Sequence, residues 1–149
     1  YKLKLKNDIV VHRDFNVSNL MLVKNQIGVI DSQDALIGNR AYDLASLIDD
    51  VRFKTSKGLK QKIYNFYINK QKKLEISKFK NDFEILSILR NLKIIGIFTR
   101  LATRDRKKRY LKLIPYTWKL INTKIYWNVL FDDLKKLLKK NFKKELNEN

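Results

Sequence analysis

The chain has 149 residues, 44% of them hydrophobic and 11% aromatic, which suits a single globular domain with a buried core and excludes a disordered segment. It contains no cysteine, which excludes disulfides and thiolate metal sites and is compatible with a reducing compartment, so we expect a cytoplasmic protein. No apolar run reaches the roughly 18 residues of a membrane span, and the first residues do not form a signal peptide.

The formal net charge is +18, from 33 Lys and Arg against 15 Asp and Glu. Charge of this size, taken alone, favours a nucleic-acid or anionic-membrane partner. Most of it is Lys spread along the chain with abundant Asn and Ile, a mixture typical of an AT-rich genome and of solvated helix faces. We favour this second interpretation and expect no membrane or nucleic-acid partner. A basic nucleic-acid-binding helical module stays as the alternative, supported by the run Arg104–Tyr110 and the Lys-rich last helix.

Short β-branched runs open the chain, the first of them Ile9–Val11. Leu20–Val23 and Ile27–Ile30 are two more, and the polar residues Lys24–Gln26 between them predict a hairpin. Gly28 lies inside the second of these strands, where it indicates a bulge or a close backbone approach.

From Ala41 onward the apolar residues follow helical spacing, and about five helices are expected. The first, with Leu44, Leu47, Ile48 and Val51 on one face, begins near Ala41 and is followed by helices at Ser56–Gln71, Phe83–Thr103, Tyr110–Ile121 and about Asn128–Asn141. The fold class is therefore α+β and mostly α.

Particular features are expected within these helices. Phe83–Thr103 should be a central buried helix whose apolar stripe is Ile85, Ile88, Leu89, Leu92, Ile95, Gly96 and Thr99, with Gly96 permitting close packing. Pro115 should open or kink its helix. The last helix should bury Leu130, Leu134, Leu137 and Leu138, and the polar residues 143–149 should form a frayed tail.

The segment VVHRDFNVSNLM contains the most informative pattern in the chain. It places Asp14 and Asn19 five residues apart, as in the H-x-D-x-x-x-x-N catalytic loop of kinase-like enzymes, and Asp31 ends the following apolar run. In such chemistry a carboxylate like Asp14 orients the substrate hydroxyl or accepts its proton. The oxygens of Asn19 and Asp31 suit Mg²⁺ that bridges nucleotide phosphates.

The alternative is that Asp14 is a turn residue and Asn19 a helix cap. The context of strand, loop, hairpin and then an Asp favours the catalytic interpretation. His12, the only histidine, we expect to hold the loop by hydrogen bonds rather than act as a general base.

Other polar residues near the motif are assigned supporting roles. Arg13 either meets phosphate or braces the loop, and Asp34 either supports Asp31 or forms a turn. Asp43 either caps its helix or hydrogen-bonds back to the catalytic loop. Two further acids, Asp49 and Asp50, are expected to be solvated.

Four separated segments together carry a family resemblance: HRDFNVSNLM, GVIDSQDALIG, AYDLASLIDDVR and RNLKIIGIFTRLATRD. They resemble the aminoglycoside phosphotransferase/choline kinase family, and within it the bacterial amino-sugar kinases that phosphorylate the anomeric hydroxyl of N-acetylmuramate and N-acetylglucosamine in cell-wall recycling. The similarity runs from about Val10 to Ile121. It implies a two-lobed protein-kinase-like fold with residues 1–142 as most of the C-terminal lobe, with ATP as co-substrate, Mg²⁺ as cofactor and a small sugar as acceptor.

The resemblance also implies roles at matching positions. Asp14 would be the catalytic base, Asn19 and Asp31 the Mg²⁺ ligands, and Asp43 a buried anchor of the loop backbone. Two positions depart from the family: Asn16 stands where a His is usual, and Ser32 stands where an aromatic residue is usual after the metal-binding Asp.

The parts that would cradle the nucleotide phosphates are not found in the sequence. The chain has only 4 Gly, none in a G-x-G loop, and no strand Lys paired with a helix Glu can be identified. We therefore expect a C-terminal fragment that lacks its nucleotide-binding lobe and is inactive alone. A degenerate scaffolding pseudokinase is the other alternative, and the retention of all three site residues speaks against it.

Overall fold

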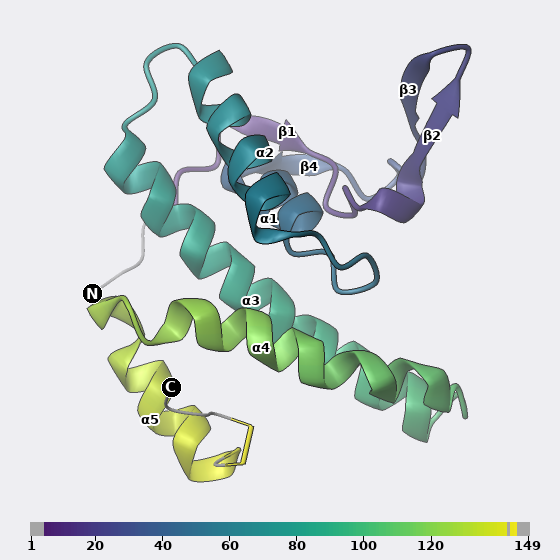
Figure 1. Cartoon of the computed structure of the whole chain (residues 1–149), viewed down its shortest axis with the longest axis vertical. Helices are drawn as coiled ribbons and strands as arrows, with labels where there is room; N and C mark the ends of the chain where they lie inside the picture. The colour runs from purple at the N-terminus through teal and green to yellow at the C-terminus, as the bar shows by residue number, and fades with distance from the viewer. Residues whose placement is uncertain (1–4, 143, 146–149) are drawn as a thin grey trace. The chain divides into compact units, whose positions relative to one another are not determined.

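The computed structural model describes residues 5–142 and 144–145 of the chain (Figure 1). Within these residues, short antiparallel strand pairs are followed by five α-helices, which confirms the predicted α+β, mostly helical class. The chain divides into two compact units, Tyr1–Ser87 and Ile88–Asn149. Most of the expected frayed tail, residues 143 and 146–149, lies outside the described residues.

Two antiparallel strand pairs begin the first unit. β1 (Ile9–Val11) pairs with β4 (Leu36–Gly38), and β2 (Leu20–Val23) pairs with β3 (Gln26–Val29). The prediction of β1 and of the hairpin is confirmed, whereas β4 was missed because three residues show too little alternation. The β1–β4 pair holds together the two ends of a long segment, residues 12–35, which contains the kinase-like motif.

Backbone geometry explains two features of these strands. A Cβ added at Gly38 would lie 2.5 Å from a methyl group of Val11, so only glycine lets β4 approach β1 at this point. Lys24 and Asn25 have φ values of 46° and 63°, the positive values of a two-residue hairpin turn. Gly28 pairs with Met21 in regular register, and an added Cβ would make only ordinary contacts, so the expected bulge or close approach is wrong.

The helices of the first unit follow the strands. α1 spans Ala41–Ile48, α2 spans Lys57–Lys70, and α3 runs from Ile76 to Thr103. α1 ends before the predicted Val51 because Asp49 leaves helical geometry. α2 is as predicted, and the Ser56 hydroxyl accepts a hydrogen bond from the Leu59 amide at its N-terminus. α3 begins well before the predicted Phe83.

The core of the first unit holds α1 in place. It consists of seven buried residues from α1 and α3: Ala41, Leu44, Ala45, Ile48, Phe79, Phe83 and Leu86. Side chains of α2 cover this core, with Tyr67 stacked on Phe79 at 5.5 Å and Tyr64 edge-on to Phe83 at 5.1 Å between ring centroids. α1 is therefore a rigid support for any side chain that it presents to the loop after β1.

Asp49 and Asp50 follow α1, and the expectation that they are solvated is wrong. Each is 1% exposed. Asp49 Oδ1 lies 3.0 Å from Lys60 Nζ, and its Oδ2 accepts a hydrogen bond from the Ser87 hydroxyl at 2.5 Å. Both carboxylate oxygens of Asp50 accept hydrogen bonds from backbone amides. Charged groups tolerate burial when they are paired or hydrogen-bonded in this way, a condition that local sequence does not reveal.

The second unit contains the remainder of α3 and four further elements. These are η2 (Lys108–Leu113), α4 (Ile114–Ile125), η3 (Val129–Phe131) and α5 (Asp132–Asn141). Pro115 lies in the first turn of α4 and therefore opens the helix rather than kinking it. No helix in the described part of the chain is long and apolar enough to cross a membrane.

Burial along α3 corrects parts of its predicted pattern. The predicted stripe of α3 is right at Ile85 and Ile88, but Leu89 is 48% exposed and Gly96 and Thr99 are also exposed. A Cβ added at Gly96 would meet nothing within 4 Å, so its expected close packing is wrong. Past Arg90, which is also buried, the buried positions are Asn91, Ile94, Phe98 and Ala102. They are spaced by three or four residues, which places them on a helix face beside the predicted one.

The last helix also differs from its prediction. Its first part forms η3 instead of regular helix, with the Asn128 side chain accepting the Leu130 amide. Of the four leucines expected on its buried face, Leu138 alone is buried, and Leu137 is 58% exposed.

Candidate active site

Asp14 lies on the loop that leaves β1 and is exposed to solvent. Among the described residues, no group donates a hydrogen bond to its carboxylate. Its backbone carbonyl instead accepts three hydrogen bonds, from Asn19 Nδ2 at 2.9 Å, from Asn16 Nδ2 at 3.1 Å and from the Asn16 amide at 2.9 Å. These bonds curl the loop around Asp14 while leaving its carboxylate open to a ligand.

Asp43, in the first turn of α1, holds the start of the loop. Its two oxygens accept the backbone amides of His12 at 2.7 Å and Arg13 at 3.0 Å. Arg13 has a φ of 72°, a conformation that is strained for a residue with a side chain. The bonds that its own amide and the His12 amide donate to Asp43 offset this strain. The geometry matches the second of the two roles considered for Asp43, a bond back to the loop.

His12 links the loop to the end of the hairpin. Its Nε2 lies 2.9 Å from the carbonyl oxygen of Ile30. Because a carbonyl can only accept, Nε2 carries the proton, and the other ring nitrogen is buried without a partner among the described residues. The ring therefore contacts the residue just before Asp31 and not the Asp14 carboxylate.

Asn19 and Asp31 are brought together by a second link to the hairpin. The Ile30 amide donates to the carbonyl of Asn19 at 3.1 Å, and Asn19 Nδ2 lies 3.5 Å from Asp31 Oδ2. Asp31 has a φ of 69°, and its other oxygen accepts from Gln33 Nε2 at 2.6 Å. The Asn19 side chain thus links the loop that carries Asp14 to Asp31.

Asn19 and Asp31 are the residues here whose oxygens could hold a magnesium ion together with a nucleotide. The side-chain oxygen of Asn19 accepts no hydrogen bond from the described residues, and it lies on the same amide that meets Asp31. The described residues contain no cluster of three or more His, Cys, Asp or Glu that could hold a metal by itself. Mg²⁺ in phosphoryl-transfer sites is typically held by one or two protein oxygens together with phosphates and water, so a pair of ligands suffices.

The remaining predicted residues act through the backbone of the loop. Arg13 Nη1 donates to the carbonyl of Asp34 at 3.3 Å, which braces the loop against the segment after Asp31. Asp34 contributes its carbonyl to this contact, and its side chain is exposed. Asn16 is buried, and its side-chain oxygen accepts the Ser18 amide at the start of the 3₁₀ turn η1 (Val17–Asn19). Ser32 accepts the Ala35 amide through its carbonyl in a turn.

Asp50 is a residue of this site that the motif analysis missed. Its Oδ2 accepts the Val17 amide at 3.2 Å, and its Oδ1 accepts the Arg52 amide at 2.9 Å. Helical spacing could not have revealed it, because Asp50 lies beyond the end of α1, and only the folded chain brings it to Val17.

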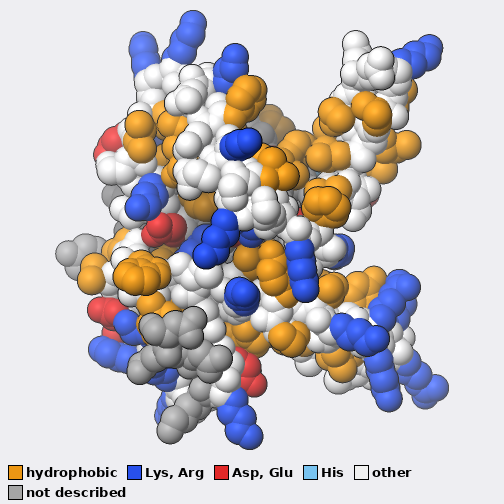
Figure 2. Space-filling model, in the orientation of Figure 1, with side chains coloured by type: hydrophobic (Ala, Val, Ile, Leu, Met, Phe, Trp, Pro, Cys, Tyr) orange, Lys and Arg blue, Asp and Glu red, His pale blue; other side chains and the backbone are white. Residues whose placement is uncertain are grey.

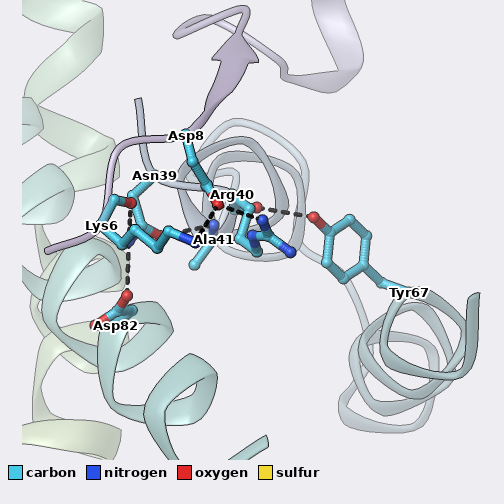
Figure 3. Close-up of polar contacts among 7 residues, drawn as sticks. All are labelled: Lys6, Asp8, Asn39, Arg40, Ala41, Tyr67 and Asp82. Atoms are coloured by element: carbon cyan, nitrogen blue, oxygen red, sulfur yellow. Dashed lines mark hydrogen bonds and ion pairs between the residues drawn. The ribbon is translucent and has the colours of Figure 1, made fainter. Parts of the chain in front are cut away.

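A separate polar cluster lies at the N-terminus of α1 (Figure 3). Arg40 Nη2 and Lys6 Nζ approach Asp8 Oδ2 at 2.5 and 3.1 Å, and their charges and hydrogen bonds lower the pKa of the Asp8 carboxyl. Asn39 Nδ2 donates to Asp82 Oδ2 at 2.6 Å and to the Lys6 carbonyl at 3.0 Å. The cluster fastens the segment before β1 to α1 and α3.

Two further features border this cluster. The Tyr67 hydroxyl donates to the Arg40 carbonyl at 3.0 Å, and burial raises the pKa of this hydroxyl. A pocket of about 220 Å³ beside the cluster is lined by both cationic and acidic side chains, among them Lys73, Lys78 and Glu75. None of the predicted site residues lines it.

Comparisons with known proteins identify the family. Residues 2–72, which include β1, the loop and α1, match the phosphotransferase enzyme family. The chain is similar to proteins named N-acetylmuramate/N-acetylglucosamine kinase: 38% identical over 113 residues in Neisseria meningitidis serogroup B, 32% over 130 residues in Caulobacter vibrioides and 33% over 123 residues in Pseudomonas aeruginosa.

These alignments cover 72%, 84% and 78% of this chain, respectively. The chain spans about a third of the length of each relative, 34% for the first two and 36% for the third. The predicted family is confirmed: through residues 2–72, the chain belongs to the phosphotransferase enzyme family.

Proposed function

We propose that this chain carries the catalytic loop of a kinase that transfers the γ-phosphoryl group of ATP to a hydroxyl of a small molecule. The observation that carries the proposal is the state of Asp14, an exposed carboxylate that accepts no hydrogen bond from the described residues, on a loop whose backbone is bonded at several points. A group that must meet a substrate hydroxyl needs this combination of access and fixed position.

In the proposed reaction, Asp14 accepts a hydrogen bond from the acceptor hydroxyl and aligns its oxygen for in-line attack on the γ-phosphorus. The bond from that phosphorus to the bridging oxygen of ADP breaks as the new phosphate ester forms, and Asp14 takes up the hydroxyl proton. No covalent intermediate with the protein is required. The contribution of the chain is positioning, which reduces the entropic cost of bringing the two reactants together.

Asn19 and Asp31 are the proposed ligands of the nucleotide-bound metal. When bound, Mg²⁺ neutralises charge on the phosphates that are transferred and released. His12 would hold the Asp31 segment at the loop through Ile30, and Asp43 would hold the loop itself. We further propose that residues 1–142 form most of the C-terminal lobe of a two-lobed kinase-like fold, in which another lobe cradles the nucleotide phosphates.

For the acceptor we propose the anomeric hydroxyl of a cell-wall amino sugar, N-acetylmuramate or N-acetylglucosamine. Support comes from the names of the relatives, which are similar to this chain over both of its units. The product would be a sugar 1-phosphate, and the reaction would serve the recycling of cell-wall sugars.

The test is an acceptor panel with the full-length protein and Mg²⁺·ATP. N-acetylmuramate, N-acetylglucosamine, choline and an aminoglycoside are compared by ADP release, and products are identified by ³¹P NMR. We expect a 1-phosphate from the amino sugars that requires Mg²⁺. Phosphorylation of choline or the aminoglycoside alone would refute the sugar assignment. If no acceptor in the panel supports ADP release, the proposed function is refuted.

A further inference from the structure

We propose that Asp50 is a positioning residue for the segment between Asp14 and Asn19, acting as a second backbone anchor beside Asp43. The proposal rests on the proposed function for its kinetic consequences, although the anchoring itself is a property of the loop. Asp50 does not reach the reacting atoms, and it acts on Asn19 through the backbone of the 3₁₀ turn η1.

The contacts of Asp50 point to this role. It is 1% exposed, and its two oxygens accept the amides of Val17 at 3.2 Å and Arg52 at 2.9 Å. A buried carboxylate that receives only backbone amides is satisfied as long as both amides stay in place, so losing the Val17 contact would leave part of a charge without a partner. The position of Val17 and the burial of Asp50 are therefore coupled.

Val17 is well placed to transmit this constraint. It is the first residue of η1, which ends at Asn19, and the turn is too short to be stable by itself. The Asn16 side chain caps the turn at Ser18, and Asp50 holds its first amide. Asn19 then reaches back to the Asp14 carbonyl and toward Asp31. Fixing Val17 thus sets the distance between Asp14 and Asn19.

Asp43 and Asp50 divide the loop between them. Asp43 binds the two amides before Asp14, and Asp50 binds the amide between Asp14 and Asn19. Asp43 lies in the first turn of α1 and Asp50 lies just after its C-terminal end, and α1 is packed into the core of the first unit. One rigid element therefore holds the loop on both sides of the exposed carboxylate.

The neighbouring Asp49 offers a matched control. It is the same residue type and equally buried, and it pairs with Lys60 and Ser87. Substituting either acid should lower the stability of the protein, so stability alone does not separate the two roles. Amide protection of Val17 and the Mg²⁺ requirement should change only when Asp50 is substituted.

The experiment compares Asp50→Ala, Asp50→Asn and Asp49→Asn in the full-length protein. Amide hydrogen exchange at Val17 is measured together with kcat, acceptor KM and the Mg²⁺ concentration for half-maximal rate. We expect Asp50→Ala to abolish protection of Val17, to lower kcat by about 10²-fold, as misplacement near 1 Å can do, and to raise the Mg²⁺ requirement, with acceptor KM little changed. Asp50→Asn, which retains one acceptor oxygen, should be intermediate, and Asp49→Asn should lower the melting temperature only.

Several results would overturn the inference. Val17 protection that survives Asp50→Asn unchanged, or a Mg²⁺ requirement that shifts equally in Asp49→Asn, would each do so. If Asp50→Ala does not fold, Asp50→Asn carries the test. A wild-type protein without kinase activity would refute the proposed function, and the exchange of Val17 would still decide whether Asp50 anchors the loop.

Discussion

The anchored backbone of the loop that carries Asp14 contrasts with the hairpin beside it. The loop is bonded to Asp43 and Asp50 of the α1 region, whereas β2 and β3 pair with each other and expose their apolar side chains, Leu22 at 72% and Ile27 at 64%. Figure 2 shows hydrophobic side chains along this hairpin, which lies at the upper right in both views. Rigidity of the site therefore originates in the helical core, and the hairpin contributes Asp31 through its bonds to the loop.

The largest expected effect is the loss of turnover when the exposed Asp14 is substituted. Asp14→Asn should lower kcat of the full-length enzyme by about 10²- to 10⁴-fold because the amide cannot take up the hydroxyl proton. Stability and ATP affinity should change little, since the Asp14 carboxylate is exposed and accepts no hydrogen bond from the described residues. Steady-state kinetics and ATP titration by calorimetry check both statements. Near-normal turnover would remove Asp14 from the mechanism.

The contribution of the hairpin to the site is tested at Asp31. Asp31→Asn should raise the Mg²⁺ concentration for half-maximal rate at least tenfold, since even loss of outer partners of metal ligands typically costs about 10- to 100-fold in affinity. A Mg²⁺ titration of the rate provides the measurement, with Asp34→Asn as the control because the Asp34 side chain is exposed. Equal shifts in both variants would contradict a direct role for Asp31.

The anchored side of the loop is tested at Asp43. Asp43→Ala leaves two partly buried amides without acceptors and should lower the free energy of unfolding by about 2–4 kcal/mol. Denaturant unfolding gives this value.

Asp133→Ala serves as the control for Asp43→Ala. It removes an acid from the first turn of α5, but that carboxylate is fully exposed, so the change should be within about 0.5 kcal/mol. A similar loss in both variants would mean that Asp43 acts only through the helix terminus.

A smaller effect on stability is expected from a substitution in the turn of the hairpin. Asn25→Gly places glycine at a φ of 63° in the turn and should stabilise the protein by at most about 1 kcal/mol, because glycine adopts this conformation without strain. Thermal unfolding measures the gain. Catalytic constants should stay the same, and a changed kcat would show that the turn is coupled to the loop.

The smallest effect concerns pH and the cluster around Asp8. Arg40 and Lys6 lower the pKa of this carboxyl in the folded state, so its contribution to stability is present above the ordinary pKa of an aspartate and is lost as pH falls through the lowered value. Melting temperatures of wild type and Asp8→Asn should therefore differ at neutral pH and converge in acid. A difference that persists in acid would contradict the pairing.

Several features were predictable because they depend on local chemistry. The spacing of Asp14 and Asn19, the hairpin with its turn at Lys24 and Asn25, and the helix Lys57–Lys70 with its Ser56 cap all follow from neighbouring residues. The order of elements from strands to helices was predictable for the same reason.

Other features depend on groups distant in sequence. The strand β4 exists because Gly38 can approach Val11, and Asp49 is buried because Lys60 and Ser87 reach it. The buried face of α3 differs from its apolar stripe because neighbouring elements, and not the helix itself, decide which side is covered.

Residue type and spacing were enough to predict the family and to nominate candidate residues for phosphoryl transfer. The tertiary structure alone decided how those residues are held. It assigned Asp43 to the amides before Asp14, Asp50 to the amide after it and His12 to Ile30. The physical reason is that a buried carboxylate or imidazole must find partners wherever the packed chain supplies them, and only the folded backbone determines which amides and carbonyls lie within reach.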